Sequence, residues 1–115
     1  MRYLKTYEAI NDNLQIGDYV ICKTDTGDEK IIDFIENNVG QYVRYITNNK
    51  EVVDNFRYVI EYENVSFELS NYSYTFSYER DIPNICMRVD RDEIIKYSKN
   101  KEELETIINA NKYNL

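Results

Sequence analysis

The chain has 115 residues, a length that fits a single domain over 1–115, and its 43% hydrophobic residues supply enough apolar area for a folded core. The 21 acidic residues exceed the 14 basic ones, giving a formal net charge of -7. Direct nucleic-acid binding is therefore not expected, because phosphate contacts require Lys and Arg. The absence of His removes the commonest general base and the commonest zinc ligand.

The N-terminal part of the chain combines an uncertain opening with a clear strand and helix. Residues 1–13 place apolar side chains at roughly helical intervals, which fits a short helix or an extended arm. A β-branched and aromatic run over 16–23, with a Gly17-Asp18 turn near its start, predicts the first strand. Near-helical apolar spacing with acids in the first turn then predicts a short helix over 28–37.

The remaining elements are short strands followed by a terminal helix. The segment 64–70 is ambiguous but alternates like a strand, and 71–78 alternates strictly. Asn100 and Glu103 match a capping box, which predicts a C-terminal helix within 99–110. Strands bounded by turn residues are expected at 41–47, 56–62, 71–78, 84–89 and 94–98.

Short strands at close spacing predict a mainly β (α+β) fold built around a small barrel over 14–98. The run Ile16-Gly17-Asp18-Tyr19-Val20-Ile21-Cys22 resembles the opening strand of SH3-like barrels. The segments 39–43, 58–62 and 93–95 resemble their second strand, their third strand, and their short turn and last strand. The resemblance implies an SH3-like barrel of five or more short antiparallel strands, with a short inserted helix and a C-terminal helix. The segment 63–83 departs from this pattern and is interpreted as an insertion.

A second resemblance covers the whole layout. With its Tyr3-Leu4-Lys5-Thr6-Tyr7 start and its end over 109–114, the chain is similar to small uncharacterised phage proteins from A/T-rich hosts. That resemblance implies a phage origin. It implies no activity, because the SH3-like fold carries many unrelated functions.

The sequence offers little chemistry for catalysis or metal binding. The loop Asp25–Glu29 lacks the alternating acids and closing Glu of a calcium loop, so a solvated turn is expected. Acid–base work by Asp90, Asp92 and Glu93 would need burial and a cleft, whereas a polar turn predicts exposure. Cys22 has no His partner to activate it. We therefore expect no catalytic residue, no metal, no cofactor and no enzymatic activity.

Two cysteines are too few for a disulfide-rich scaffold. Cys22 and Cys86 each lie in an apolar run, which predicts two buried reduced thiols, with a disulfide as the alternative in an oxidising compartment. No apolar stretch approaches the roughly 20 residues of a membrane span, and the N-terminus lacks the apolar region of a signal peptide. A cytoplasmic protein is expected, in the host cytoplasm if phage-encoded, with no membrane partner.

Two surfaces are candidates for binding a partner. Tyr72, Tyr74, Phe76 and Tyr78 share one face of the expected strand, which is either core or an exposed aromatic platform. The acids around the first loop and helix are either a solubilising face or an imitation of a phosphate backbone. The candidate partner-binding residues are Tyr72, Tyr74, Tyr78, Asp25, Asp28, Glu29, Asp33 and Glu36.

Size, acidity and missing catalytic groups together favour a non-enzymatic interaction protein. The expected partner is another protein with a basic surface, and a host nucleic-acid-processing protein would make this chain an anti-CRISPR-like inhibitor. The alternative is a structural or adaptor barrel module of a virion or replication complex. In that case a homo-oligomer could form by pairing of the tyrosine strand with another copy.

Overall fold

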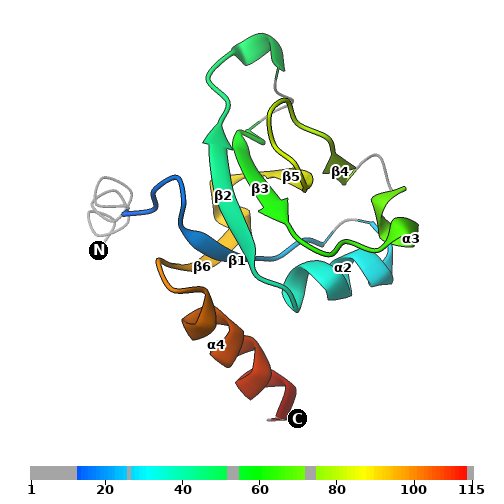
Figure 1. Ribbon diagram of the computed structural model, residues 1–115, viewed down its shortest axis with the longest axis vertical. Helices are drawn as coiled ribbons and strands as arrows, with labels where there is room; N and C mark the ends of the chain where they lie inside the picture. The colour runs from blue at the N-terminus through cyan, green and yellow to red at the C-terminus, as the bar shows by residue number, and fades with distance from the viewer. Residues whose placement is uncertain (1–12, 26, 52–54, 72–74, 114–115) are drawn as a thin grey trace.

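The computed structural model describes residues 13–25, 27–51, 55–71 and 75–113, and the structural statements below concern these residues. They form a compact α+β domain with one six-stranded antiparallel sheet (Figure 1). The strands are β1 (Tyr19–Cys22), β2 (Gly40–Tyr45), β3 (Tyr58–Tyr62), β4 (Phe76–Ser77), β5 (Ile85–Val89) and β6 (Ile94–Ser98). The helices are α2 (Glu29–Glu36), α3 (Phe67–Ser70) and α4 (Lys101–Tyr113), with 3-10 turns η1 (Asn49–Glu51) and η2 (Arg91–Glu93).

The sheet is open, which corrects the expectation of a closed barrel. Its strand order is β4-β5-β3-β2-β1-β6, so β4 and β6 form the two edges and do not pair with each other. The physical reason lies in the segment 63–83, which supplies β4. That strand pairs with β5 through Phe76↔Met87 and Ser77↔Cys86, and so occupies the edge that β6 would have to meet for closure.

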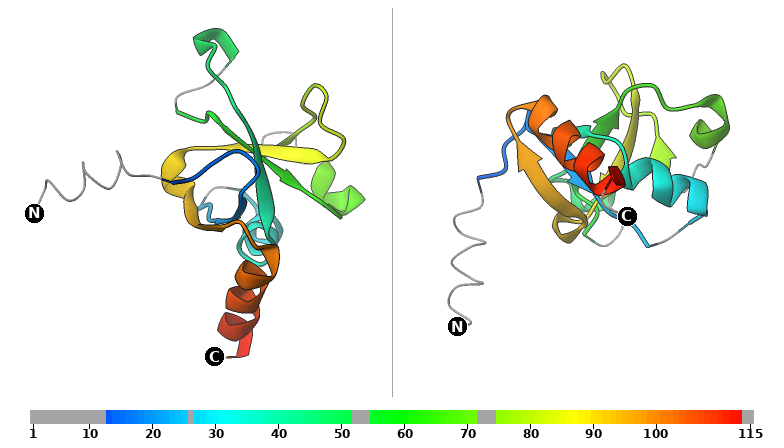
Figure 2. Two further views of the ribbon diagram at one scale, coloured as in Figure 1. Left: turned by 60° about the vertical axis from the view of Figure 1, so that its left-hand side comes forward. Right: turned by 90° about the horizontal axis from the view of Figure 1, so that it is seen from below.

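β1 is buried on both of its faces, which explains its continuous apolar sequence. Val20 and Cys22 belong to the main core, whereas Ile21 packs in a second cluster with Leu104 and Ile108 of α4. β1 is shorter than the expected 16–23, because the chain turns just before it at Gly17, which has a φ of +103°. Figure 2 shows α4 leaving the sheet from this contact and extending toward the C-terminus.

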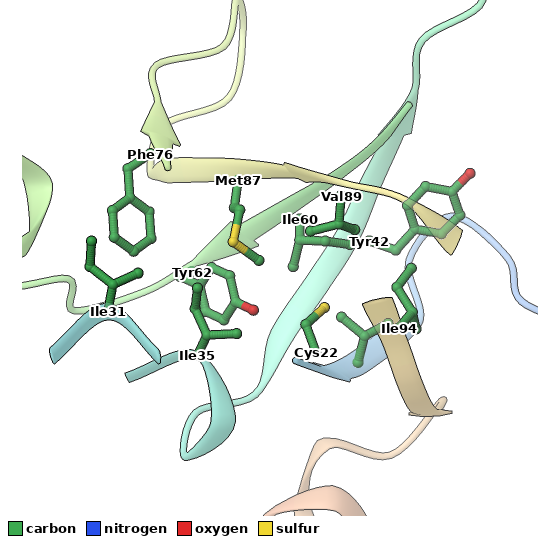
Figure 3. Close-up of a cluster of buried hydrophobic side chains, with 11 residues drawn as sticks. Cys22, Ile31, Ile35, Tyr42, Ile60, Tyr62, Phe76, Met87, Val89 and Ile94 are labelled. Atoms are coloured by element: carbon green, nitrogen blue, oxygen red, sulfur yellow. The ribbon is translucent and has the colours of Figure 1, made fainter. Parts of the chain in front are cut away.

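The main core lies between the sheet and α2. Ile31 and Ile35 of α2 face Tyr62, Phe76 and Met87 of the sheet (Figure 3). The expected helix over 28–37 is confirmed as α2, and Asp28 is its N-cap, accepting a hydrogen bond of 2.8 Å from the Lys30 amide.

Gly40 begins β2, three residues after Asn37 caps the end of α2. A Cβ at Gly40 would lie 2.9 Å from Tyr62 Cε1 and closer still to the Ile60 side chain. Glycine is therefore required here for close packing, because any side chain would overlap the core of β3.

The largest departure from expectation is in the segment 64–70. In place of alternating strands it forms α3, whose N-cap Ser66 accepts a hydrogen bond of 3.2 Å from the Leu69 amide. Asn71 caps the end of α3, and the described part of the expected strand over 71–78 contains β4, Phe76–Ser77, while residues 72–74 lie outside the described residues. Local Ser capping thus outweighs a period-2 apolar pattern.

The other elements match the expected strands closely. β5 (Ile85–Val89) begins one residue after the start of the expected 84–89, β6 covers the expected 94–98, and η2 forms a single helical turn between them. α4 continues to Tyr113, past the expected end of the helix, and the N-terminal arm or helix over 1–13 lies almost wholly outside the described residues. In the described part of the chain, no helix combines the length and the apolar character needed to cross a membrane.

Candidate functional site

An open groove of about 990 Å³ lies beside the main core. Its walls come from the loop after β1, the end of α2, the residue run before β3, strands β4 and β5, and η2. The lining residues are Lys23, Thr24, Asp25, Glu36, Phe56, Thr75, Phe76, Ser77, Met87, Arg88, Asp90, Asp92 and Glu93. Five of these are acids and two are bases, so the groove has the sign of the whole chain.

Glu93 is the most firmly positioned acid of the groove. It is half-buried, and its Oε1 accepts a hydrogen bond of 2.9 Å from the Asp90 amide in a capping box that closes η2. The Lys23 amide donates to the Glu93 carbonyl over 2.9 Å, which ties η2 to the end of β1. These two hydrogen bonds to the backbone therefore restrict the orientation of the Glu93 carboxylate.

The electrostatics of Glu93 are unfavourable for a bare carboxylate. Burial raises the pKa of Glu93 above its ordinary value, and the nearby charges of Asp90 and Asp25 raise it further, whereas Lys23 and the bond from the Asp90 amide oppose the shift. Within the described ranges, no Lys or Arg nitrogen lies within ion-pair distance of this carboxylate. An external cation would relieve the mutual repulsion of these acids.

The groove also has an apolar component. Phe76 and Met87 are buried members of the main core that reach its floor, and Phe56 lies at its wall with 37% of its surface exposed. A groove with an apolar base and acidic walls can hold the apolar stem of a long side chain together with its charged head.

Glu79 has the opposite environment. Its side chain is 6% exposed, and the Arg88 guanidinium binds it through Nε–Oε2 and Nη2–Oε1 contacts of 3.0 and 3.1 Å. Ser77 Oγ donates to the same carboxylate over 2.7 Å. The hydrogen bonds from Arg88 hold the pKa of Glu79 below its ordinary value, against the effect of burial, with Ser77 and Arg44 acting in the same direction as Arg88.

The structure places two of the five predicted acids in the groove. Asp25 and Glu36 line it, whereas Asp28 caps α2 and Asp33 accepts a hydrogen bond of 3.0 Å from Asn37 Nδ2. Glu29 is exposed in the first turn of α2. The acids predicted as one patch are therefore divided between the groove and local helix contacts.

The described structure contains only part of the predicted tyrosine face. Tyr72 and Tyr74 lie outside the described residues, and Tyr78 follows the end of β4 with 79% of its surface exposed. Phe76, expected on the same face as Tyr78, is buried in the main core. The strand stops between these two residues, so the alternation no longer relates them.

Three acids that line the groove were not among the partner-binding residues predicted from the sequence. Asp90, Asp92 and Glu93 were expected to be exposed, but Glu93 is half-buried and all three line the groove. The signal that could have found Glu93 is the Asp90-x-x-Glu93 capping-box spacing, which draws the carboxylate back onto the backbone. Phe56 carries no comparable local signal.

Both cysteines are buried free thiols, as expected. Cys22 belongs to the main core and Cys86 to a separate cluster with Ile46 and Val59, so they do not face each other. Burial raises the pKa of each thiol to about 12, which keeps both protonated and poorly nucleophilic. In Figure 3 the Tyr62 hydroxyl points toward the Cys22 sulfur, and no hydrogen-bond partner at bonding geometry is found for it among the described residues.

The described residues contain no group of three or more Cys, Asp or Glu side chains arranged to hold a metal ion. No protein-family model, no curated protein and no solved structure matches the chain significantly. The groove itself is therefore the basis for a functional proposal.

Proposed function

We propose that this protein acts without catalysis, by binding a basic segment of another protein in the acidic groove. The observation that carries the proposal is the Glu93 carboxylate, which is half-buried beside Asp25 and Asp90 and has no cation partner within the described ranges. A Lys or Arg side chain from a partner would supply that missing charge. The net charge of -7 would further speed the approach of a basic protein.

The wider identity of the partner is part of the same proposal. A basic surface is typical of proteins that handle nucleic acids, since they must neutralise phosphates. We propose that the chain is phage-derived and acts in the host cytoplasm as an anti-CRISPR-like inhibitor of such a protein. The SH3-like relationship is also proposed, and it is supported by the run β6-β1-β2-β3-β5 in the sheet and by η2 directly before β6.

Calorimetric titration with a short capped peptide in which arginine alternates with glycine tests the proposal. We expect saturable binding that weakens with added salt, and none with the matching glutamate peptide. Asp92→Lys should weaken binding about tenfold, because it places a cation in the groove wall. The matched control, Glu102→Lys, changes the net charge equally on the exposed side of α4 and should change the affinity less than about twofold.

Absence of binding to the basic peptide, or equal losses in the two variants, would contradict the proposal. Equal losses would mean that only the net charge of the protein attracts the peptide. The groove would then have no special role.

One observation favours a structural or adaptor role as a second candidate. β6 is an edge strand of the sheet, and its Ile95 and Tyr97 are exposed by 50% and 36%. An edge strand that carries exposed apolar side chains can pair with a strand of another copy. Mass measurement in solution separates the candidates: a stable dimer that Ile95→Lys converts to monomer favours this second role, and a monomer at all concentrations excludes self-pairing.

A further inference from the structure

We infer that the end of the groove at Glu93 selects arginine over lysine, an inference that rests on the proposed function. It names the side chain that a basic partner would insert.

The protein itself uses arginine to satisfy a nearly buried carboxylate. Arg88 holds Glu79 through two parallel contacts, Nε–Oε2 at 3.0 Å and Nη2–Oε1 at 3.1 Å. A planar guanidinium matches a carboxylate in this two-point manner, whereas the ammonium group of lysine is a compact point charge. A desolvated carboxylate in this fold is thus compatible with a guanidinium at close range.

Glu93 presents one carboxylate oxygen for such a contact. Oε1 is engaged by the Asp90 amide at 2.9 Å, and within the described residues no donor engages Oε2. Asp25, Asp90 and Asp92 line the same groove as Glu93, and the charges of Asp25 and Asp90 help to raise its pKa. The five N–H donors of a guanidinium can reach more than one acceptor at once, and their fixed fork favours acceptors that the backbone already holds in place.

The apolar lining adds a second reason for arginine. Phe56 presents part of its ring to the groove, and Phe76 and Met87 form apolar floor beneath it. Guanidinium is more weakly hydrated than ammonium and stacks on aromatic rings, so it enters such a groove at a lower desolvation cost.

The charged groups around Glu93 make the binding proton-linked. The charged groups that act on Glu93 are Asp90, the N-cap of η2, and Asp25 and Lys23 in the loop after β1. The buried Cys22 and Tyr62 side chains also lie within its electrostatic influence. Because burial and the two aspartates raise the pKa of Glu93, an inserted cation must lower it again. Binding at a pH near that raised value should therefore release a proton, and affinity should rise with pH there.

The experiment compares three probes by calorimetric titration with the full chain: the arginine–glycine peptide, the lysine–glycine peptide of equal charge, and spermine. We expect the arginine peptide to bind about tenfold tighter than the lysine peptide, as one additional charge-assisted hydrogen bond would give. Glu93→Gln should bring the two peptides to within about twofold of each other, while Glu102→Gln should leave the ratio unchanged.

Each outcome decides between the two proposals. Equal affinity for the two peptides overturns arginine selection and leaves the proposed function intact, whereas no binding of either peptide overturns both. Spermine binding as tightly as the arginine peptide also overturns the inference, because it indicates a general polycation site. If Glu93→Gln does not fold, Asp25→Asn provides the same comparison, and an unchanged arginine preference in that variant counts against the inference.

Discussion

Two glutamates that are partly or largely buried in this small domain have opposite electrostatic environments. Glu79 is 6% exposed and is enclosed by Arg88, Arg44 and Ser77. Glu93 is half-buried near aspartates, and among the described residues its carboxylate accepts a hydrogen bond from one backbone amide, that of Asp90 in its own capping box. The pKa of Glu79 is lowered and that of Glu93 is raised, so the two sites differ in the sign of the surrounding potential.

The Glu79 carboxylate has cation partners within the chain, whereas the Glu93 carboxylate has none among the described residues. At Glu79 the chain supplies its own cations, and the result is a structural contact between the loop after β4 and strand β5. At Glu93 the described residues supply no ion-pair partner, and the site opens into a groove. Stability experiments should therefore be dominated by Glu79, and binding experiments by Glu93.

The largest expected effect comes from breaking the Glu79 site. Glu79→Gln should lower the free energy of unfolding by about 2 kcal/mol, because it leaves Arg88 beside a neutral amide; partial exposure of Arg88 limits the loss. Urea denaturation measures this change. A loss below about 0.5 kcal/mol would show that solvent already satisfies Arg88 and that the pair contributes little.

A smaller gain is expected from removing an unsatisfied hydroxyl in the core. Tyr62→Phe should raise the free energy of unfolding by about 1 kcal/mol, since the buried hydroxyl finds no hydrogen-bond partner among the described residues. The same denaturation assay applies, with Tyr78→Phe as an exposed control expected to change little. Destabilisation by Tyr62→Phe would instead identify the Cys22 thiol as an effective partner.

The pH dependence of stability should separate the two glutamates by sign. Because the pKa of Glu79 lies below its ordinary 4.5, its contribution is present above pH 4.5 and is lost as the pH falls through the lowered value. The pKa of Glu93 is raised, so its contribution is present below pH 4.5 and is lost as the pH rises through the raised value. Denaturation midpoints across a pH series should lose the first change in Glu79→Gln and the second in Glu93→Gln.

The smallest expected effect is at the Glu93 site at neutral pH. Glu93→Gln should raise the free energy of unfolding by no more than about 0.5 kcal/mol, because it removes a partly desolvated charge that solvent still screens while the amide oxygen keeps the bond to the Asp90 amide. Thermal denaturation at neutral pH, with Glu102→Gln as control, measures it. A clear loss of stability would mean that the Glu93 charge is already satisfied within the folded chain.

Much of the fold follows from local sequence rules. Asp28 with the apolar spacing of Ile31 and Ile35 predicts α2, and the Asp90 and Glu93 spacing is that of the η2 turn. The alternation predicted over 71–78 does not extend to Tyr78, because β4 ends at Ser77, and the end of a strand depends on which partner strand is present. The sequence could not show whether the sheet closes into a barrel, because closure depends on which strand β4 pairs with.

The candidate site was harder to predict than the fold. Asp25 and Glu36 were found because acids are frequent around the first loop and helix. Phe56 and Glu93 are distant in sequence and line one groove only because the sheet folds, so no local pattern relates them. The sequence shows that the chain is rich in acidic residues. The burial that raises the pKa of Glu93, however, arises only when the chain packs.

β1, with only four residues, joins two otherwise separate apolar clusters. Val20 and Cys22 point into one cluster, and Ile21 points toward α4 in the other. Opening either side exposes part of the same strand, so the terminal helix and the main body should lose their amide protection together. In a hydrogen-exchange experiment the backbone amides of β1 should therefore exchange last, at a rate that reports the opening of the whole domain.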